Sequence, residues 1–116
     1  MLGGEQLIGS DAIRGYNDTF ILSILLAGDS YGYAISKQIR EISQGEYSIK
    51  ETTLYSAFNR LEKNGYIESF PGEVTHGKKR TYYKITTNGK HYLNEKLHEW
   101  QVTKAVVERF VKELEK

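Results

Sequence analysis

The feature that most constrains this fold is a capped helix followed directly by a basic hairpin, between Ser48 and Lys90. Ser48 and Glu51 have the spacing of a capping box, in which each side chain hydrogen bonds a free backbone amide at the other residue. Gly65 stands where a left-handed residue ends a helix. The pattern therefore predicts a helix from Ser48 to Gly65.

This helix has an apolar side and a polar side. The residues that share the apolar side, which must face a core, are Leu54, Ala57, Phe58 and Leu61. The residues on or beside the polar side are Thr52, Ser56, Asn59 and Lys63, flanked by Tyr55 and Arg60. Small hydroxyls, an amide and cations suit base edges and phosphates. An ordinary amphipathic helix would show the same pattern.

The hairpin follows the helix at once. Residues 66–70 and 81–85 alternate in polarity and are rich in β-forming residues, which predicts two strands. The loop between them, residues 71–80, has two glycines and ends in Lys78, Lys79 and Arg80. We expect a flexible tip whose cations can meet phosphates beside a groove. The alternative is a turn kept soluble by its charge.

Two further helices are expected upstream. Residues 20–26 are apolar almost all round, so this helix should be buried on more than one side. Gly28 should end it, and Asp29 or Ser30 should cap the next helix. The expected inner face of that next helix consists of Ala34, Ile35, Ile39 and Ile42. Three helices and a two-stranded wing predict a mainly α fold with a small β-wing, the winged helix-turn-helix.

The last element starts at residues 86–88 and runs to the C-terminus as one helix. Apolar residues recur at heptad-like spacing, interrupted by Lys104, at Leu93, Leu97, Trp100, Val107, Val111 and Leu114. A helix of roughly 28 residues is about 42 Å long, more than a small domain can cover. We expect a homodimer that packs these helices together. The alternative is a helix that folds back on its own domain.

Composition limits the domain organisation and the classes of function that this chain can have. We expect one domain, divided into a flexible N-terminus (1–10), a winged helix-turn-helix (11–86) and a C-terminal dimerisation helix (87–116). The chain has no cysteine, and His76, His91 and His98 have no partners that would complete a metal site. We find no cofactor fingerprint and no nucleophile–base pattern, so we expect neither a cofactor, nor a metal, nor an enzyme.

Charge is concentrated in the middle of the chain. Residues 1–30 hold one arginine and four acids, residues 31–90 hold ten basic residues and six acids, and residues 91–116 hold five of each. The excess of cations thus falls on the helix and hairpin, and local cations rather than net charge govern affinity for DNA. No apolar run is long enough to span a bilayer and the N-terminus lacks a signal pattern, so we expect a cytoplasmic protein without a membrane partner.

Three stretches resemble the PadR family of bacterial transcriptional regulators. They are GDSYGYAI at 28–35, TLYSAFNRLEKNGYI at 53–67 and GKKRTYYKIT at 77–86, the last followed by Gly89. The resemblance extends over residues 18–114. Because one helix follows the wing, the chain is similar to the short branch of the family, which includes multidrug-sensing members. The resemblance implies a homodimeric repressor that binds double-stranded DNA at a pseudo-palindromic operator.

The candidate DNA contacts lie on the predicted reading helix and wing. They are Lys50, Thr52, Thr53, Tyr55, Ser56, Asn59, Arg60, Lys63, Lys78, Lys79 and Arg80. Tyr55 is included because it flanks the reading face and the family has tyrosine at this place. We expect the wing cations to grip phosphates, and the helix to supply the groove contacts.

Trp100, the one tryptophan, lies mid-helix on the expected dimer seam. Multidrug-sensing relatives line a pore at the dimer interface with a tryptophan at the matching place, so the resemblance implies a site for a planar aromatic effector. Its expected walls are Thr19, Ser23, Leu93, Lys96, Leu97, Trp100 and Lys104. With Lys96 and Lys104 one turn away on either side and Glu99 expected to point elsewhere, neutral or anionic compounds should be preferred. The alternative is a tryptophan that only fills the interface.

Two other functions fit the residues. One is a regulator of the same fold that answers to no small molecule. The other is a winged-helix module that binds protein, against which the cationic wing and the polar reading face argue.

Overall fold

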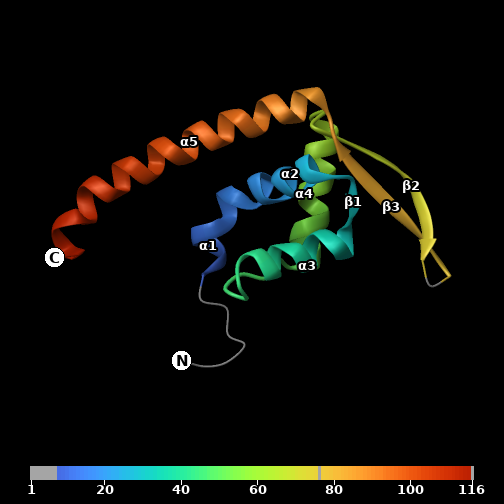
Figure 1. The fold of residues 1–116 in the computed structure, drawn as a ribbon, viewed down its shortest axis with the longest axis horizontal. Coiled ribbons are helices and arrows are strands. Elements are labelled where there is room, and N and C mark those ends of the chain that lie inside the picture. Colours follow the sequence, from blue (N-terminus) through green and yellow to red (C-terminus); the bar gives the residue numbers. More distant parts are fainter. Residues whose placement is uncertain (1–7, 76, 116) are drawn as a thin grey trace.

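A computed structural model describes residues 8–75 and 77–115. The expected flexible N-terminus lies largely outside this range, as does His76. In chain order the elements are α1 (Ser10–Ile13), η1 (Arg14–Tyr16), α2 (Asn17–Ala27), β1 (Ser30–Tyr31), α3 (Gly32–Ile42), α4 (Glu51–Lys63), β2 (Ile67–Thr75), β3 (Lys78–Ile85), α5 (Thr87–Val111) and η2 (Lys112–Glu115). Figure 1 shows α1 to α4 flanked by the wing, with α5 passing over them. This arrangement confirms the winged helix-turn-helix with a long C-terminal helix.

The core forms where α2, α3 and α4 meet beneath the sheet. The apolar side of α4 is buried as predicted, with Leu54, Ala57, Phe58 and Leu61 each about 1% exposed. Phe58 stacks on Tyr83 of β3 with ring centroids 4.1 Å apart, which joins α4 to the wing. The expected inner face of α3 is correct for Ile35 and Ile39 but wrong for Ile42, which is 71% exposed.

The beginning of α4 differs from the prediction. The helix begins at Glu51, its N-cap is Lys50 rather than Ser48, and no side-chain hydrogen bond caps it there. Tyr47 and Ile49 are both buried, at 5% and 6% exposure. The side chains on either side of Ser48 are thus packed in the core, and the helix begins only after Lys50, whose backbone is extended.

The end of α4 follows the prediction. Gly65 has φ of +78°. Tyr66 N–H donates to the Leu61 carbonyl and Gly65 N–H to the Glu62 carbonyl, the two bonds of a Schellman motif. The chain therefore turns sharply from α4 into the wing.

The sheet is larger than expected. The strands extend through most of the segment predicted as a loop, and a register shift between Pro71 and Val74 absorbs the irregularity. Lys78, Lys79 and Arg80 consequently lie on β3 rather than on a flexible tip. Charged residues can lie in an antiparallel strand pair whose faces are exposed to solvent. The glycines and cations of residues 71–80 therefore led to a wrong prediction of a loop.

A third strand was also missed. Ser30 and Tyr31 form β1, which pairs antiparallel with β3 at Tyr83 and Tyr82 and gives the order β1-β3-β2. The N-cap of α3 is therefore Tyr31, not Asp29 or Ser30, and no side-chain hydrogen bond caps it. A strand of two residues has no periodicity that a sequence pattern can reveal.

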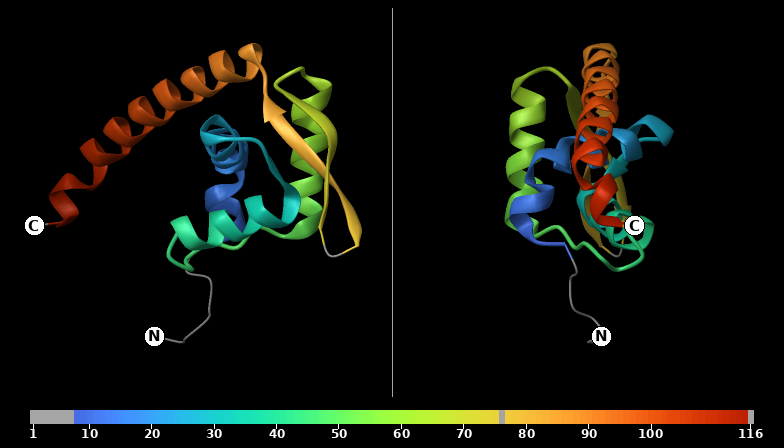
Figure 2. Two further views of the ribbon diagram at one scale, coloured as in Figure 1. Left: turned by 45° about the vertical axis from the view of Figure 1, so that its right-hand side comes forward. Right: turned by 90° about the vertical axis from the view of Figure 1, so that its left-hand side faces the viewer.

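The start of α5 is fixed by a compact set of contacts with the end of α4. The Thr86 hydroxyl accepts from Gly89 N–H at 3.0 Å and donates to the Gly65 carbonyl at 2.6 Å. Thr86 N–H donates to the Tyr66 carbonyl at 3.0 Å. The helix packs on α2 with its first half, and Figure 1 and the left view of Figure 2 show its second half extending away from the other helices.

Gly89 should be essential to this contact between the end of α4 and the start of α5. A Cβ there would lie 2.1 Å from the backbone oxygen of Tyr66 and 2.8 Å from Ile85, so Gly89→Ala must displace backbone. We expect a loss of about 1–3 kcal/mol of unfolding free energy, measured by urea denaturation. Gly15→Ala is the control, because a Cβ at Gly15 meets nothing within 4 Å. Equal midpoints for the two variants would contradict the packing argument.

Candidate nucleic-acid interface

The polar face of α4 is open to solvent. Thr52, Thr53, Ser56, Asn59 and Lys63 are all exposed, opposite the buried apolar side. Lys50, directly before the helix, is exposed as well. The structure thus gathers these predicted contact residues on one continuous surface, free for an external partner.

One flank of this surface is hollowed. A cavity of about 300 Å³ separates α4 from the segment leading into α2, and its lining comprises Arg14, Asn17, Thr52, Thr53, Ser56, Ala57 and Arg60. Arg14 was not among the predicted site residues. It is a cation on an element 38 residues before Thr52, so only the fold brings it to this face.

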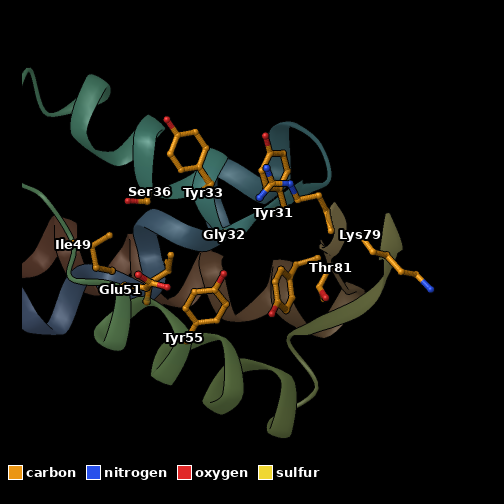
Figure 3. A pocket seen from close by; sticks show the side chains of 12 residues that line it. Tyr31, Gly32, Tyr33, Ser36, Ile49, Glu51, Tyr55, Lys79 and Thr81 are labelled. Carbon is orange, nitrogen blue, oxygen red and sulfur yellow. The ribbon is translucent and has the colours of Figure 1, made fainter. Parts of the chain in front are cut away.

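A larger cavity of about 490 Å³ lies on the other flank, between α3, α4 and the wing (Figure 3). Its lining comprises Tyr31, Gly32, Tyr33, Ser36, Ile49, Glu51, Leu54, Tyr55, Lys79, Arg80, Thr81 and Tyr83. Figure 3 shows Tyr55 projecting from α4 into this space, while the Lys79 side chain extends outward. The predicted site residues did not include Tyr31, Tyr33, Ser36 and Thr81. Tyr31 and Tyr33 nevertheless belong to the stretch 28–35 that resembles the PadR family.

Arg80 occupies a distinct position at the edge of this cavity. Its guanidinium carbon lies 5.1 Å from the centre of the Tyr31 ring, within the range of a cation–π contact. Its Nε is buried and has no hydrogen-bond partner among the described residues. A guanidinium that lines a cavity beside the N-terminus of α3 can bind an anion such as a phosphate.

Tyr55 is held in place by its neighbours. It is 44% exposed, and its ring meets Phe58 edge-on with centroids 5.4 Å apart. Its hydroxyl lies so close to Gly32 that a Cβ there would be 2.4 Å away. Burial, with smaller contributions from Tyr55 and Glu62, raises the pKa of the neighbouring Tyr83. The Tyr83 phenol is thus available at neutral pH as a hydrogen-bond donor rather than as an anion.

The cations of the site differ in their exposure and in their ion pairing. Lys78 and Lys79 are exposed, whereas Arg80 is half-buried against Tyr31. Arg60 is ion-paired with Asp18 of α2, and its side chain is 53% exposed. Arg60 therefore reaches the α4 surface with part of its charge already neutralised.

The expected effector residues lie along the contact of α5 with α2 and beyond it. Trp100 is 43% exposed and meets Tyr16 edge-on, with centroids 5.5 Å apart. Leu97 and Lys104 are exposed, and Thr19 and Leu93 are half-buried. Ser23 instead lines an apolar cavity of about 170 Å³ whose other lining residues come from the N-terminal segment, α1, α2, α3 and the α3–α4 loop.

The charge pattern around Trp100 includes one ion pair. The Glu99 carboxylate lies 3.5 Å from Lys96 Nζ. Burial lowers the pKa of Lys96, but Tyr92 and Glu99 outweigh it and leave the pKa raised. Lys96 remains a cation with a partner, so Lys104 is the cation that lacks such an ion pair among the described residues.

Comparisons with known proteins agree with this geometry. The PadR-like family of transcriptional regulators matches residues 21–95. The chain belongs to this family. It is 61% identical to a transcriptional regulator from Clostridium thermocellum, with a TM-score of 0.83 over 88% of this chain and 99% of the other. It is 41% identical to a PadR family regulator from Clostridium difficile, with a TM-score of 0.73 over 84% of this chain and 99% of that one.

A curated relative also covers the chain. An uncharacterised protein of Lysinibacillus sphaericus is 45% identical over 109 residues, which are 94% of this chain and all of the relative. PadR-like proteins are transcriptional regulators rather than enzymes, and they bind DNA, typically as dimers. Within residues 8–75 and 77–115, no helix has the length and apolarity to cross a membrane.

The wing lysines should contribute charge without sequence preference. Lys78→Ala with Lys79→Ala should weaken binding to all duplexes and lower the slope of log affinity against log salt by roughly two, because about 0.9 counterions are released per neutralised phosphate. Lys84→Ala with Lys90→Ala removes the same charge from exposed positions near the other end of the wing. Titrations by fluorescence anisotropy at several salt concentrations measure both slopes. Equal slopes for the two double variants would remove the wing from the interface.

Proposed function

We propose that this PadR-like regulator is a homodimeric repressor whose α4 enters the major groove of an operator. The observation that carries the proposal is the open polar face of α4, flanked by two cavities and by the wing cations. A helix can enter the major groove, where side-chain amides and hydroxyls meet base edges. On this account Thr52, Thr53, Tyr55, Ser56 and Asn59 contact the groove.

The cations position the protein on the duplex. Lys50, Lys63, Lys78 and Lys79 would contact phosphates around the groove, since each is exposed beside the reading face. The larger cavity would accept a backbone phosphate between Arg80 and the N-terminus of α3. The place of Arg80 in the lining of this cavity supports this, because a guanidinium binds a phosphate through charge-assisted hydrogen bonds.

The second half of α5 supports the dimer. Its residues Val107 and Phe110 are 52% and 78% exposed, and Leu114 of the adjoining η2 is 81% exposed. A contiguous apolar stripe of this kind marks an interaction surface. A two-fold axis between paired α5 helices would present two copies of α4 to one duplex, which makes the operator a pseudo-palindrome. Repression would follow where the bound dimer covers the site that polymerase uses.

We further propose a planar aromatic effector at this interface. The partial exposure of Trp100 and its edge-on contact with Tyr16 support the proposal, since a flat ring can stack on the free face of the indole. Lys104 favours a neutral or anionic compound. Binding would shift the α5 helices and so change the distance between the two reading helices.

Selection from a random-sequence duplex library tests DNA binding. We expect the protein to recover an inverted repeat, bound with the salt dependence that phosphate contacts impose. Asn59→Ala should change the preferred base at one position of each half-site, where a lost bidentate contact is worth about 1–3 kcal/mol of discrimination. Failure to enrich any duplex would overturn the proposed function. An unchanged preference in the variant would remove Asn59 from readout.

Fluorescence of the one tryptophan tests the effector. Anilinonaphthalene sulfonate, an anionic probe, should quench Trp100 emission saturably and release the selected duplex. Ethidium, a planar cation, should not quench the emission of the DNA-free protein, because like charges repel near Lys104. Tryptophan amide titrated in parallel corrects for absorption by the probes. Saturable quenching by ethidium alone would contradict the charge argument, and quenching by neither would leave Trp100 as interface packing.

A further inference from the structure

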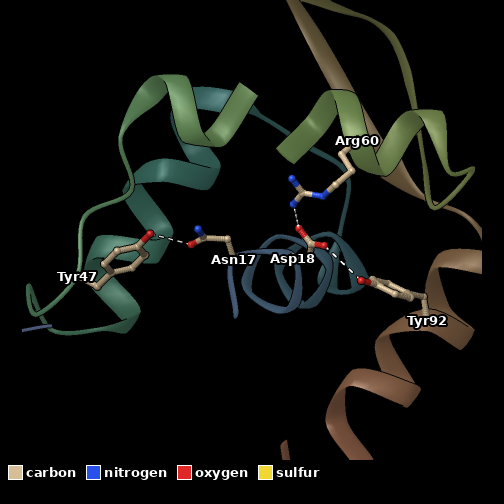
Figure 4. Close-up of polar contacts among 5 residues, drawn as sticks. All are labelled: Asn17, Asp18, Tyr47, Arg60 and Tyr92. Carbon is tan, nitrogen blue, oxygen red and sulfur yellow. Dashed lines mark hydrogen bonds and ion pairs between the residues drawn. The ribbon is translucent and has the colours of Figure 1, made fainter. Parts of the chain in front are cut away.

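Three consecutive residues at the start of α2 each reach a different part of the fold. Tyr16 meets Trp100 of α5, and the Asn17 side chain accepts a hydrogen bond from the Tyr47 hydroxyl at 2.8 Å. Asp18 joins both Arg60 of α4 and Tyr92 of α5 (Figure 4). We call residues 16–18 the junction. It lies between the reading helix and the helix proposed to form the dimer.

Asp18 is the centre of this junction. Its side chain is 14% exposed, so its charge is only partly solvated and depends on its partners. One carboxylate oxygen pairs with Arg60, and the other accepts from the Tyr92 hydroxyl at 3.4 Å. Because one carboxylate binds both partners, a change at Arg60 alters the hydrogen bond that Asp18 accepts from the Tyr92 hydroxyl.

Tyr92 transmits any such change to α5. Its ring stacks on Tyr66, with centroids 4.2 Å apart and planes at 9°, and Lys96 Nζ lies 5.4 Å from its centre. Burial first, and then the charge of Asp18, raise the pKa of Tyr92. The hydroxyl is therefore protonated at neutral pH and acts as the donor to Asp18.

Arg60 also borders the exposed surface of α4. It lines the cavity of about 300 Å³ beside α4, together with Thr52 and Ser56, and it is half exposed. A phosphate that approaches this flank would compete with Asp18 for the guanidinium. The α4 surface and α5 thus share one set of contacts through the junction.

We infer that Asp18 and Tyr92 are positioning residues that couple DNA engagement by α4 to the placement of α5. The inference rests on the proposed DNA binding. When a phosphate draws Arg60 away, Asp18 keeps Tyr92 as its remaining partner, and α5 shifts against α2. Since coupling between two sites is reciprocal, a displacement of α5 equally changes how Arg60 is held.

Trp100 reports this coupling without a label. It lies eight residues beyond Tyr92 on α5, about 12 Å along the helix. Its contact with Tyr16 places it against the junction itself. A shift of α5 relative to residues 16–18 must therefore change the surroundings of the indole.

The experiment measures Trp100 emission at saturation with the duplex that the wild-type protein selects. Saturation is verified separately by the anisotropy of labelled duplex. Asp18→Asn removes the charge, and Tyr92→Phe removes only the hydroxyl and keeps the ring stack. Asp11→Asn is the matched control for charge, because Asp11 pairs with Arg14 at the surface. Tyr66→Phe is the matched control for loss of a phenol in the same stack.

We expect the duplex to shift the emission of the wild-type protein and of both controls. Asp18→Asn and Tyr92→Phe should each lose more than half of that shift while still binding the duplex. An emission shift that is absent from the wild type, or unchanged in either Asp18→Asn or Tyr92→Phe, would overturn the inference with DNA binding intact. If no duplex is selected, the proposed function fails and the coupling fails with it.

Discussion

The arrangement of this protein depends on a close contact at the point where α4 ends and α5 begins. Gly89 lies directly against the Tyr66 carbonyl, and the Thr86 hydroxyl bridges Gly65 and Gly89. These contacts set α4, the base of the wing and α5 at fixed angles to one another. The polar face of α4 and the projecting α5 keep a fixed arrangement on one small core because the contacts between Gly65, Tyr66, Thr86 and Gly89 are tightly packed.

Local rules predicted those parts of the fold that short segments determine by themselves. The buried side of α4 follows from its 3.6-residue period, and the turn at Gly65 follows from the cost of a left-handed backbone to other residues. Thr86 was expected at the start of the last helix, and it is the N-cap there. The polar face of α4 was predictable because it is the complement of a clear apolar side.

What the sequence could not reveal depends on partners far along the chain. Ser30 pairs with Tyr83, and Arg60 finds Asp18 across 42 residues, so neither contact leaves a local pattern. Tyr47 and Ile49 are buried on either side of Ser48, and α4 begins only at Glu51. The cavity lined by Tyr31 and Arg80 likewise arises only when α3 and the wing converge, although both belong to stretches that had been singled out.

The central claim is that two chains, joined through α5, engage one duplex. Sedimentation velocity with the selected duplex tests it most directly, using Val107→Glu to place a charge on the exposed apolar stripe and His98→Glu to place the same charge elsewhere on α5. We predict two chains per duplex for the wild type and for His98→Glu, and loss of that complex for Val107→Glu. One wild-type chain per duplex, or an undiminished complex with Val107→Glu, would contradict the account.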